Sequence, residues 1–168
     1  MNPLESAAQQ FEALKDSNGL PAGIPFERVP SEIWAFLELR FPGIWPQWFQ
    51  ELTTRYRLGG GWFYLCLDPD DVERRWPCMW RRPSEFLVEA FQYFTPIEDL
   101  ASIGLVPFAD GEDGNVWVFR SSDGYDPEVY FTSLYGWAKD CVPTEENGLI
   151  PARMKMSDLL QYGASQYD

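Results

Sequence analysis

The feature that most constrains the fold is the order of two kinds of hydrophobic pattern along the chain. Helical spacing dominates the first half, where apolar residues recur three or four positions apart, as in residues 45–56. From residue 103 onward, short β-favouring segments alternate with turns rich in Gly, Asp and Pro. Helices followed by strands, without strict alternation, favour an α+β domain. We therefore expect a single domain with a central, mostly antiparallel sheet flanked by helices.

Helical signals occur at both ends of the chain and through its first half. At the N-terminus, Asn2 as the cap, Pro3 at the first helical position and Glu5 in the first turn mark a helix start. The segment 85–94 also fits the helical period, with a strand as the alternative for so short a run. Helices are expected at about residues 3–14, 31–40 (sharing a face through Ile33, Phe36 and Leu37), 45–56, 72–76, 85–94 and, capped by Ser157, 157–162.

Strand signals begin after Gly59, Gly60 and Gly61. These glycines end the preceding helix and turn the chain into residues 62–67, and at least one of them should need a positive φ. Residues 62–67 are apolar throughout, which predicts a strand covered on both faces. Further strands are expected at 103–109, 115–120 and 128–134, with 137–142 as another candidate; residues 77–83 are interpreted as irregular and 143–151 as a polar loop.

The chain is expected to comprise an N-terminal helix with a Pro-rich connection (residues 1–29) and an α+β domain (residues 30–168). The first helix either packs on the domain or forms a dimer contact, so we expect a monomer or a weak dimer. The N-terminus has no basic leader or apolar signal segment, and no uncharged run exceeds ten residues. These features predict a cytoplasmic protein without a membrane span.

The absence of histidine excludes most hydrolase designs. Without imidazole there is no Ser-His-Asp or Cys-His relay and no HExxH zinc helix. Cys66, Cys78 and Cys141 form no CxxC pair and are interpreted as reduced, mostly buried thiols. We expect no catalytic residues, no metal site and no cofactor.

Two short motifs have a chemical alternative to their structural explanation. Residues 110–114 (Asp-Gly-Glu-Asp-Gly) resemble part of a calcium loop, but the later ligands of such a loop are missing. The three glycines at 59–61 lie between a helix and a strand, which is the reverse of the order in a phosphate loop. A turn is the better explanation of both motifs.

Acidic residues are concentrated in the second half of the chain. The sequence contains 26 acidic and 13 basic residues, and its net charge of -13 would repel nucleic-acid phosphates. Residues 1–84 contain 11 acids and 9 bases, whereas residues 85–168 contain 15 acids and 4 bases. Two explanations are open, because acids in turns are commonly solvated turn formers, and clustered acids also form docking surfaces for basic partners.

The docking explanation assigns roles to residues in and near the predicted turns. Carboxylates would steer a basic partner and form ion pairs, and two aromatic side chains would supply buried anchors. Trp117 and Tyr130 lie inside predicted strands, where core packing is the expected role. The candidate partner-binding residues are Asp110, Glu112, Asp113, Asp123, Tyr125, Asp126, Glu128 and Trp137.

Several segments together carry a resemblance to a known family. Residues 45–52 (Trp-Pro-Gln-Trp-Phe-Gln-Glu-Leu) lead to the glycines, then to residues 65–72 and Trp76. Residues 105–119 contain an apolar-Pro-apolar-Ala strand, a glycine-containing turn and a second strand, and residues 156–160 begin a closing helix. This arrangement resembles the SUKH superfamily of Smi/Knr-type immunity proteins over about residues 30–163. The residues with structural roles in this pattern are Gly59, Gly60, Gly61, Pro107, Gly111 and Gly114.

The resemblance implies an α+β fold and, in bacteria, a non-enzymatic immunity protein that neutralises a polymorphic toxin, often a nuclease. An acidic surface suits this role, because a nuclease presents a positive cleft to phosphates. The expected partner is a cognate toxin with a basic surface, encountered in interbacterial competition. The alternatives are immunity to an NAD-degrading or ADP-ribosylating toxin and a role as a cytosolic regulatory scaffold. Asn115 departs from the family pattern, where Asp is usual, and the segment 77–96 is longer than expected.

Overall fold

The fold is built around one antiparallel sheet. The computed structural model describes residues 1–14, 26–66, 68–91, 97–112, 115–133 and 148–166. Its helices are α1 (Pro3–Ala13), α2 (Ser31–Arg40), α3 (Gln47–Arg55), α4 (Pro83–Phe91), α5 (Ile97–Ser102) and α6 (Met156–Ser165), with a short 3-10 helix at Ser121–Asp123. Its strands are β1 (Trp62–Leu65), β2 (Trp76–Trp80), β3 (Leu105–Asp110), β4 (Asn115–Arg120), β5 (Glu128–Ser133) and β6 (Leu149–Lys155).

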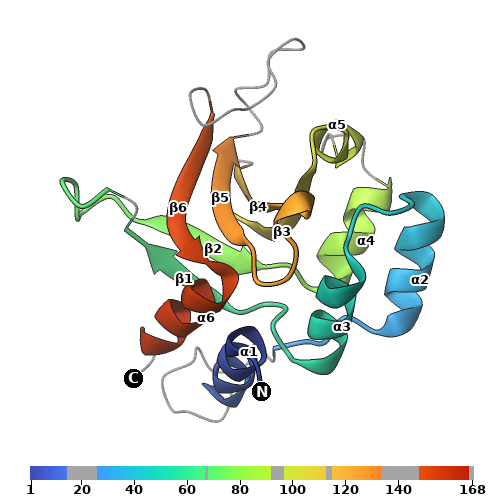
Figure 1. The fold of residues 1–168 in the computed structure, drawn as a ribbon, viewed down its shortest axis with the longest axis horizontal. Coiled ribbons are helices and arrows are strands. Elements are labelled where there is room, and N and C mark those ends of the chain that lie inside the picture. The colour runs from blue at the N-terminus through green and yellow to red at the C-terminus, as the bar shows by residue number, and fades with distance from the viewer. Residues whose placement is uncertain (15–25, 67, 92–96, 113–114, 134–147, 167–168) are drawn as a thin grey trace.

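Each strand pairs antiparallel with the next strand along the chain, so the sheet is a six-stranded meander with the order β1-β2-β3-β4-β5-β6 (Figure 1). Helices pack against this sheet. The arrangement confirms the α+β class and the antiparallel sheet that the sequence predicts. Residues 83–91 form a helix, which decides between the two alternatives for that segment.

Two strands lie where the sequence does not indicate them. β2 occupies Trp76–Trp80, so the short helix expected at 72–76 and the irregular chain expected after Pro77 are both wrong. β6 begins at Leu149, inside the expected polar loop. Proline and charged residues obscure the alternating strand pattern in both segments. Pairing with neighbouring strands nevertheless makes both segments strands, against their local sequence preference. The candidate strand at 137–142 lies outside the described residues.

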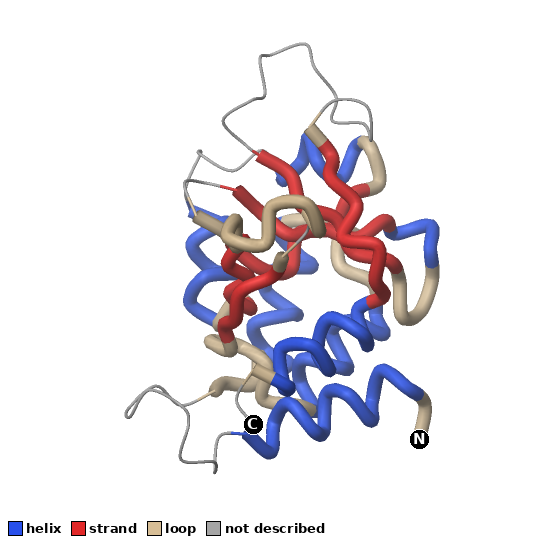
Figure 2. The backbone as a smooth tube through the Cα atoms, turned by 90° about the vertical axis from the view of Figure 1, so that its left-hand side faces the viewer, coloured by secondary structure: helices blue, strands red, loops and turns tan. Residues whose placement is uncertain are grey.

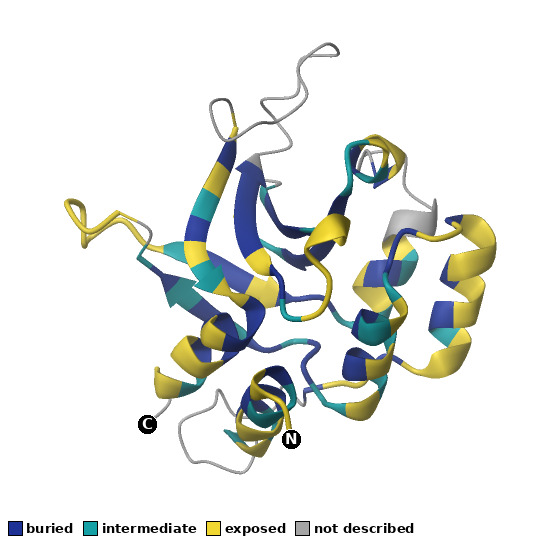
Figure 3. Cartoon of the chain, viewed as in Figure 1, coloured by how far each residue is buried: buried dark blue, intermediate teal, exposed yellow. Residues whose placement is uncertain are grey.

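β1 is an edge strand that is covered on only one face, so the prediction that residues 62–67 are covered on both faces is wrong. Phe63 and Leu65 are buried, whereas Trp62 and Tyr64 on the opposite face are partly exposed. Side chains alternate between the two faces of a strand, and only one face of β1 is covered. Figure 3 shows buried and partly exposed stretches along β1 at this edge of the sheet.

The sheet separates two apolar cores. In β4, Trp117 and Phe119 face a large core that includes residues of α1, α2, α3, α4 and α6. Val116 and Val118 face the opposite way, into a smaller core with Leu100 of α5. Trp117 and Tyr130 are both buried, which confirms the core role expected for them.

α1 begins as predicted and belongs to the large core. The Asn2 side chain accepts a hydrogen bond from the backbone N–H of Glu5 at 2.9 Å. α1 lies beside α6 (Figure 2), and the Phe11 ring stacks on Phe26 with 5.4 Å between centroids. Its buried residues are Leu4, Ala7, Ala8 and Phe11. The apolar stripe of this helix is therefore covered within a single chain.

The buried face of α2 differs from the prediction. Trp34 and Leu37 are buried and Ile33 is half-buried, but Phe36 is 40% exposed. The indole N–H of Trp34 donates to Thr53 Oγ1 at 3.0 Å, which sets the rotation of α2 against α3. Apolar side chains occur all round α2, so periodicity alone could not identify its buried face.

The glycine turn before β1 has the positive φ that the sequence predicts. Gly60 has a φ of +89°, which L side chains rarely adopt. The other two glycines are constrained by space: a Cβ on Gly61 would lie 2.4 Å from a ring carbon of Phe11, and one on Gly59 would lie 2.9 Å from the Arg81 carbonyl oxygen. All three positions therefore require glycine.

Replacing Gly60 with Val is expected to lower the stability of the fold by about 1–3 kcal/mol, because a β-branched side chain is strained at this φ. Thermal unfolding of the variant measures the loss. Val substitutions at Gly59 and Gly61 are comparison variants, which test steric clash with neighbouring atoms rather than backbone strain. An unchanged melting temperature in all three variants would contradict the placement of this turn.

Candidate functional site

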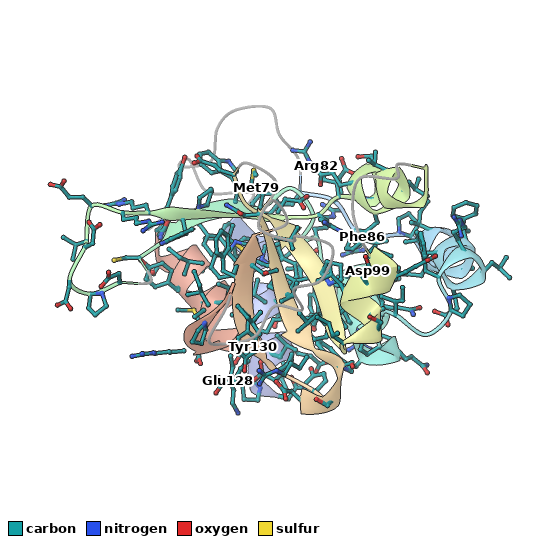
Figure 4. All side chains as sticks on the ribbon, turned by 90° about the horizontal axis from the view of Figure 1, so that it is seen from above. Met79, Arg82, Phe86, Asp99, Glu128 and Tyr130 are labelled. Atoms are coloured by element: carbon teal, nitrogen blue, oxygen red, sulfur yellow. The ribbon has the colours of Figure 1, made fainter. Side chains whose placement is uncertain are left out.

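The structure separates the predicted partner-binding residues into two groups. Asp110 and Glu112 lie at the β3–β4 turn, whereas Asp123 and Glu128 flank the β4–β5 connection. Successive turns of a meander alternate between its ends, and a strand of six residues spans roughly 17–20 Å. In Figure 4, Met79, which pairs with Asp110, and Glu128 lie on opposite sides of the molecule. The described members of the predicted set therefore do not share one surface.

Asp110 has a partner within the chain. Its Oδ1 accepts hydrogen bonds from Arg81 Nε at 3.0 Å and Arg81 Nη2 at 2.9 Å. The Arg81 side chain is 2% exposed and the Asp110 side chain 34%. A buried guanidinium needs a nearby carboxylate, because an uncompensated buried charge is costly. Asp110 thus stabilises the junction of β2 and β3.

Asp126 and Tyr125 connect the β4–β5 segment to three helices. Asp126 accepts hydrogen bonds from the backbone N–H of Ser157 at 2.8 Å and from its Oγ at 2.7 Å. Asp126 therefore binds the first turn of α6, and Ser157 lies inside that turn rather than at the cap. The Tyr125 hydroxyl donates to Asn2 Oδ1 at 2.8 Å, and its ring contacts Trp48 edge-on. Partial burial raises the pKa of the Tyr125 hydroxyl, although the residue is 42% exposed.

The other members of the predicted set that the structure describes form no side-chain hydrogen bond or ion pair with the described part of the chain. Glu112, Asp123 and Glu128 are exposed, and they remain candidates for contact with a partner. Asp113, Gly114 and Trp137 lie outside the described residues.

Pro107 and Gly111 occupy structural positions. The carbonyl oxygen of Pro107 accepts a hydrogen bond from the indole N–H of Trp45 at 3.1 Å, which joins β3 to the start of α3. A Cβ on Gly111 would lie 2.9 Å from the Phe131 ring. Both residues therefore support the sheet.

An exposed acidic hairpin lies between β1 and β2, where the sequence pattern does not predict one. Residues 68–75 are exposed along their whole length and project away from the sheet (Figures 1 and 3). We refer to them as the acidic arm. Asp and Pro favour turns as well as helix starts, so the run at 68–71 is equally compatible with the short helix expected at 72–76 and with a hairpin turn. The charged residues of the arm are Asp68, Asp70, Asp71, Glu73, Arg74 and Arg75.

Hydrogen bonds within the arm shape its turn. Asp68 Oδ1 accepts from the Asp70 N–H at 2.9 Å, and Asp71 Oδ1 accepts from the Arg74 N–H at 3.3 Å. The Arg74 guanidinium lies over the Trp76 ring, 4.3 Å from its centroid. Within the described part of the chain, the carboxylates of Asp70 and Glu73 have no hydrogen bond or ion pair. Both are available to a partner.

A hollow of about 490 Å³ lies between the base of the arm, β1 and α6. Its lining combines two tyrosine rings and a valine with a thiol, a guanidinium and an amide. Val72 is 66% exposed and Tyr162 is 40% exposed, so the apolar part is accessible. Protein interfaces place aromatic and apolar groups inside a charged rim, as this hollow and the arm do. The residues that line the hollow are Tyr64, Cys66, Val72, Arg75, Tyr162 and Gln166.

A larger hollow of about 830 Å³ between α2 and α3 has a different character. Trp34 and Trp45 line its floor but are only 3% and 2% exposed, so the aromatic surface is not accessible to a ligand. Glu38 accepts a hydrogen bond from the Gly43 N–H at 2.7 Å, and Arg55 is paired with Glu5 at 2.5 Å. Its polar groups are engaged within the chain, and we interpret it as solvated surface.

Of the three cysteines, Cys78 is buried, Cys66 is half-buried and Cys141 lies outside the described residues. In the described residues, no group of three or more Cys, Asp or Glu side chains is placed to hold a metal ion. Burial raises the pKa of the Cys78 thiol well above that of an ordinary thiol, and the negative charge of Asp110 is the second, smaller cause. The Cys66 thiol donates to the Asp68 carbonyl oxygen at 3.2 Å.

Among the described helices, none has the length and apolar character to cross a membrane.

Comparisons with known proteins do not assign the chain to a family. No family model, curated protein or solved structure matches it. The resemblance to the SUKH superfamily therefore stays a prediction from the residues.

Proposed function

We propose that the chain is a non-enzymatic immunity protein that binds and neutralises a toxin with a basic surface, most simply a nuclease. The observation that supports this is the acidic arm: an exposed hairpin that projects from the sheet, with two carboxylates that are unpaired in the described part of the chain. The hollow at its base offers Tyr64 and Tyr162 as contact surface. The SUKH resemblance is a second, independent support.

In the proposed inhibition, the acidic arm occupies the phosphate-binding cleft of the toxin. A nuclease holds phosphates with cationic side chains, and carboxylates on a projecting hairpin can take the place of phosphates in such a cleft. The net charge of -13 speeds the encounter with a basic protein over distances of about a Debye length, roughly 8–10 Å at ordinary salt. The hollow then receives an apolar side chain of the partner, which excludes water and slows dissociation.

The function is tested by co-expressing the chain with the protein encoded by the adjacent open reading frame. We expect that protein to arrest growth when it is produced alone, and growth to recover when the chain is present. An unrelated protein of similar size and net charge is the control, because it reproduces charge without the arm. Growth arrest that persists beside the chain, or a harmless neighbouring protein, would contradict the proposal.

Two charge variants test where the toxin binds. Asp70→Asn with Glu73→Gln removes two charges from the arm, and Asp123→Asn with Glu128→Gln removes two from the opposite end of the sheet. Net charge is the same in both, so only position differs. We expect the arm variant to associate with the toxin roughly threefold to tenfold more slowly at low salt, and the other variant to change by less than twofold. Surface plasmon resonance at two ionic strengths measures this, and the reverse order would place the interface at the β4–β5 end.

A further inference from the structure

The outer edge of β1 has a hydrogen-bonding pattern that suits an added strand. Tyr64 faces Pro77 across the β1–β2 ladder, and proline has no N–H to offer. Residues of an antiparallel strand alternate between bonding to one neighbour and pointing to the other side. Both the N–H and the C=O of Tyr64 therefore point away from β2, beyond the edge of the sheet.

A side-chain amide occupies this position in the structure. The Tyr64 N–H donates to Gln166 Oε1 at 3.1 Å, and Gln166 Nε2 donates to the Tyr64 carbonyl oxygen. A carboxamide offers the same donor and acceptor as a peptide group. Gln166 therefore takes the place that one peptide group of an added strand would take. Gln166 is exposed and directly follows the last residue of α6, so its movement away from Tyr64 disturbs no core packing.

We propose that the edge of β1 is a strand-addition site, which Gln166 occupies in the free protein, for an extended segment with alternating cationic and apolar side chains. The side chains of an added strand alternate between two faces. Carboxylates of the acidic arm lie at one end of this edge and favour Lys or Arg. The hollow beside Tyr64, Val72 and Tyr162 favours apolar side chains.

The chemistry of the edge disfavours a second copy of the chain as the occupant. β1 itself has the sequence Trp-Phe-Tyr-Leu, which contains no cation for the arm. Each copy also has a net charge of -13, so two copies repel each other. The inference concerns recognition of an extended basic segment, and it does not depend on that segment belonging to a toxin.

Amide hydrogen exchange tests the role of Gln166. In Gln166→Ala, the Tyr64 amide should exchange about tenfold faster, because it loses its acceptor. Gln161→Ala is the matched control, since it makes the same chemical change at an exposed position of the same helix. An equal exchange rate at Tyr64 in wild type and Gln166→Ala would overturn the proposal.

A peptide probe tests strand addition directly. Acetyl-Lys-Val-Lys-Val-Lys-Val-amide should bind Gln166→Ala about tenfold more tightly than wild type, because nothing competes for Tyr64, and should slow exchange of the Tyr64 amide again. A control peptide of the same sequence with alternate peptide nitrogens methylated keeps the charge but cannot form the hydrogen bonds of strand pairing. It should bind Gln166→Ala at least tenfold more weakly than the unmethylated peptide. Equal binding of the control peptide, or no binding of either peptide to Gln166→Ala, would overturn the proposal. Dimerisation of Gln166→Ala without peptide would also overturn it, in favour of a second copy.

Discussion

Replacing Phe49 with Ala is expected to lower the free energy of unfolding by about 4 kcal/mol, the largest single effect that we predict. The ring of Phe49 is fully buried and joins α3 to its neighbours and to the sheet. Truncation removes apolar area and leaves a cavity that the surrounding indole and phenyl rings, most of them in edge-on or tilted contact, cannot easily fill. The rings in contact with Phe49 are those of Trp34, Trp48, Trp80, Phe86 and Phe119.

Urea unfolding followed by tryptophan fluorescence measures this loss. Leu39→Ala is the control, because Leu39 is apolar but 86% exposed, and its truncation should change stability by less than about 0.5 kcal/mol. If Phe49→Ala cost no more than Leu39→Ala, α3 would not be anchored in the core in the way the structure shows.

Replacing Asp110 with Ala is expected to lower the free energy of unfolding by about 3 kcal/mol. The variant removes the carboxylate that accepts two hydrogen bonds from the buried Arg81 guanidinium. Asp110→Asn keeps an oxygen acceptor but loses the charge, so its loss should be smaller. Glu112→Ala, two residues further on at an exposed position, should be nearly neutral.

Chemical denaturation of these three variants separates a structural acid from a partner-binding one. A fully stable Asp110→Ala variant would show that the pair with Arg81 contributes little, and would restore Asp110 as a candidate for contact with a partner. A loss of stability at Asp110 alone would mean that any weakening of partner binding in this variant reports unfolding as well as contact. For this reason the charge variants proposed above leave Asp110 unchanged.

The sequence located the excess of acidic residues but not the surfaces that they form. Asp110 and Asp126 look like ordinary turn acids in the sequence, and their partners Arg81 and Ser157 lie 29 and 31 residues away. The acidic arm carried a visible signal in its Asp-Pro-Asp-Asp run, but a helix cap and a hairpin turn share that signal. The edge position of Tyr64 had no signal in the sequence, because it depends on register with Pro77.

What the sequence by itself determined are features set by interactions within a few residues. The Asn2 cap of α1, the positive φ at Gly60 and the strand at 115–120 all follow from local geometry and side-chain type. The order of helical and strand patterns also determined the fold class, since a chain of strands joined by short turns pairs antiparallel.

Only the tertiary structure decided which segments became β2 and β6, which face of α2 is buried, and which acids are exposed. The physical reason is that strand pairing, burial and ion pairing join residues far apart in the chain. Pro77 is accepted in β2 because its position needs no N–H toward β1. Trp34 rather than Phe36 is buried because its ring packs against Trp45, Phe49 and Phe86, and Thr53 of α3 accepts its indole N–H. The free energies of strand pairing, burial and ion pairing depend on partner residues that lie outside the local sequence pattern around a residue.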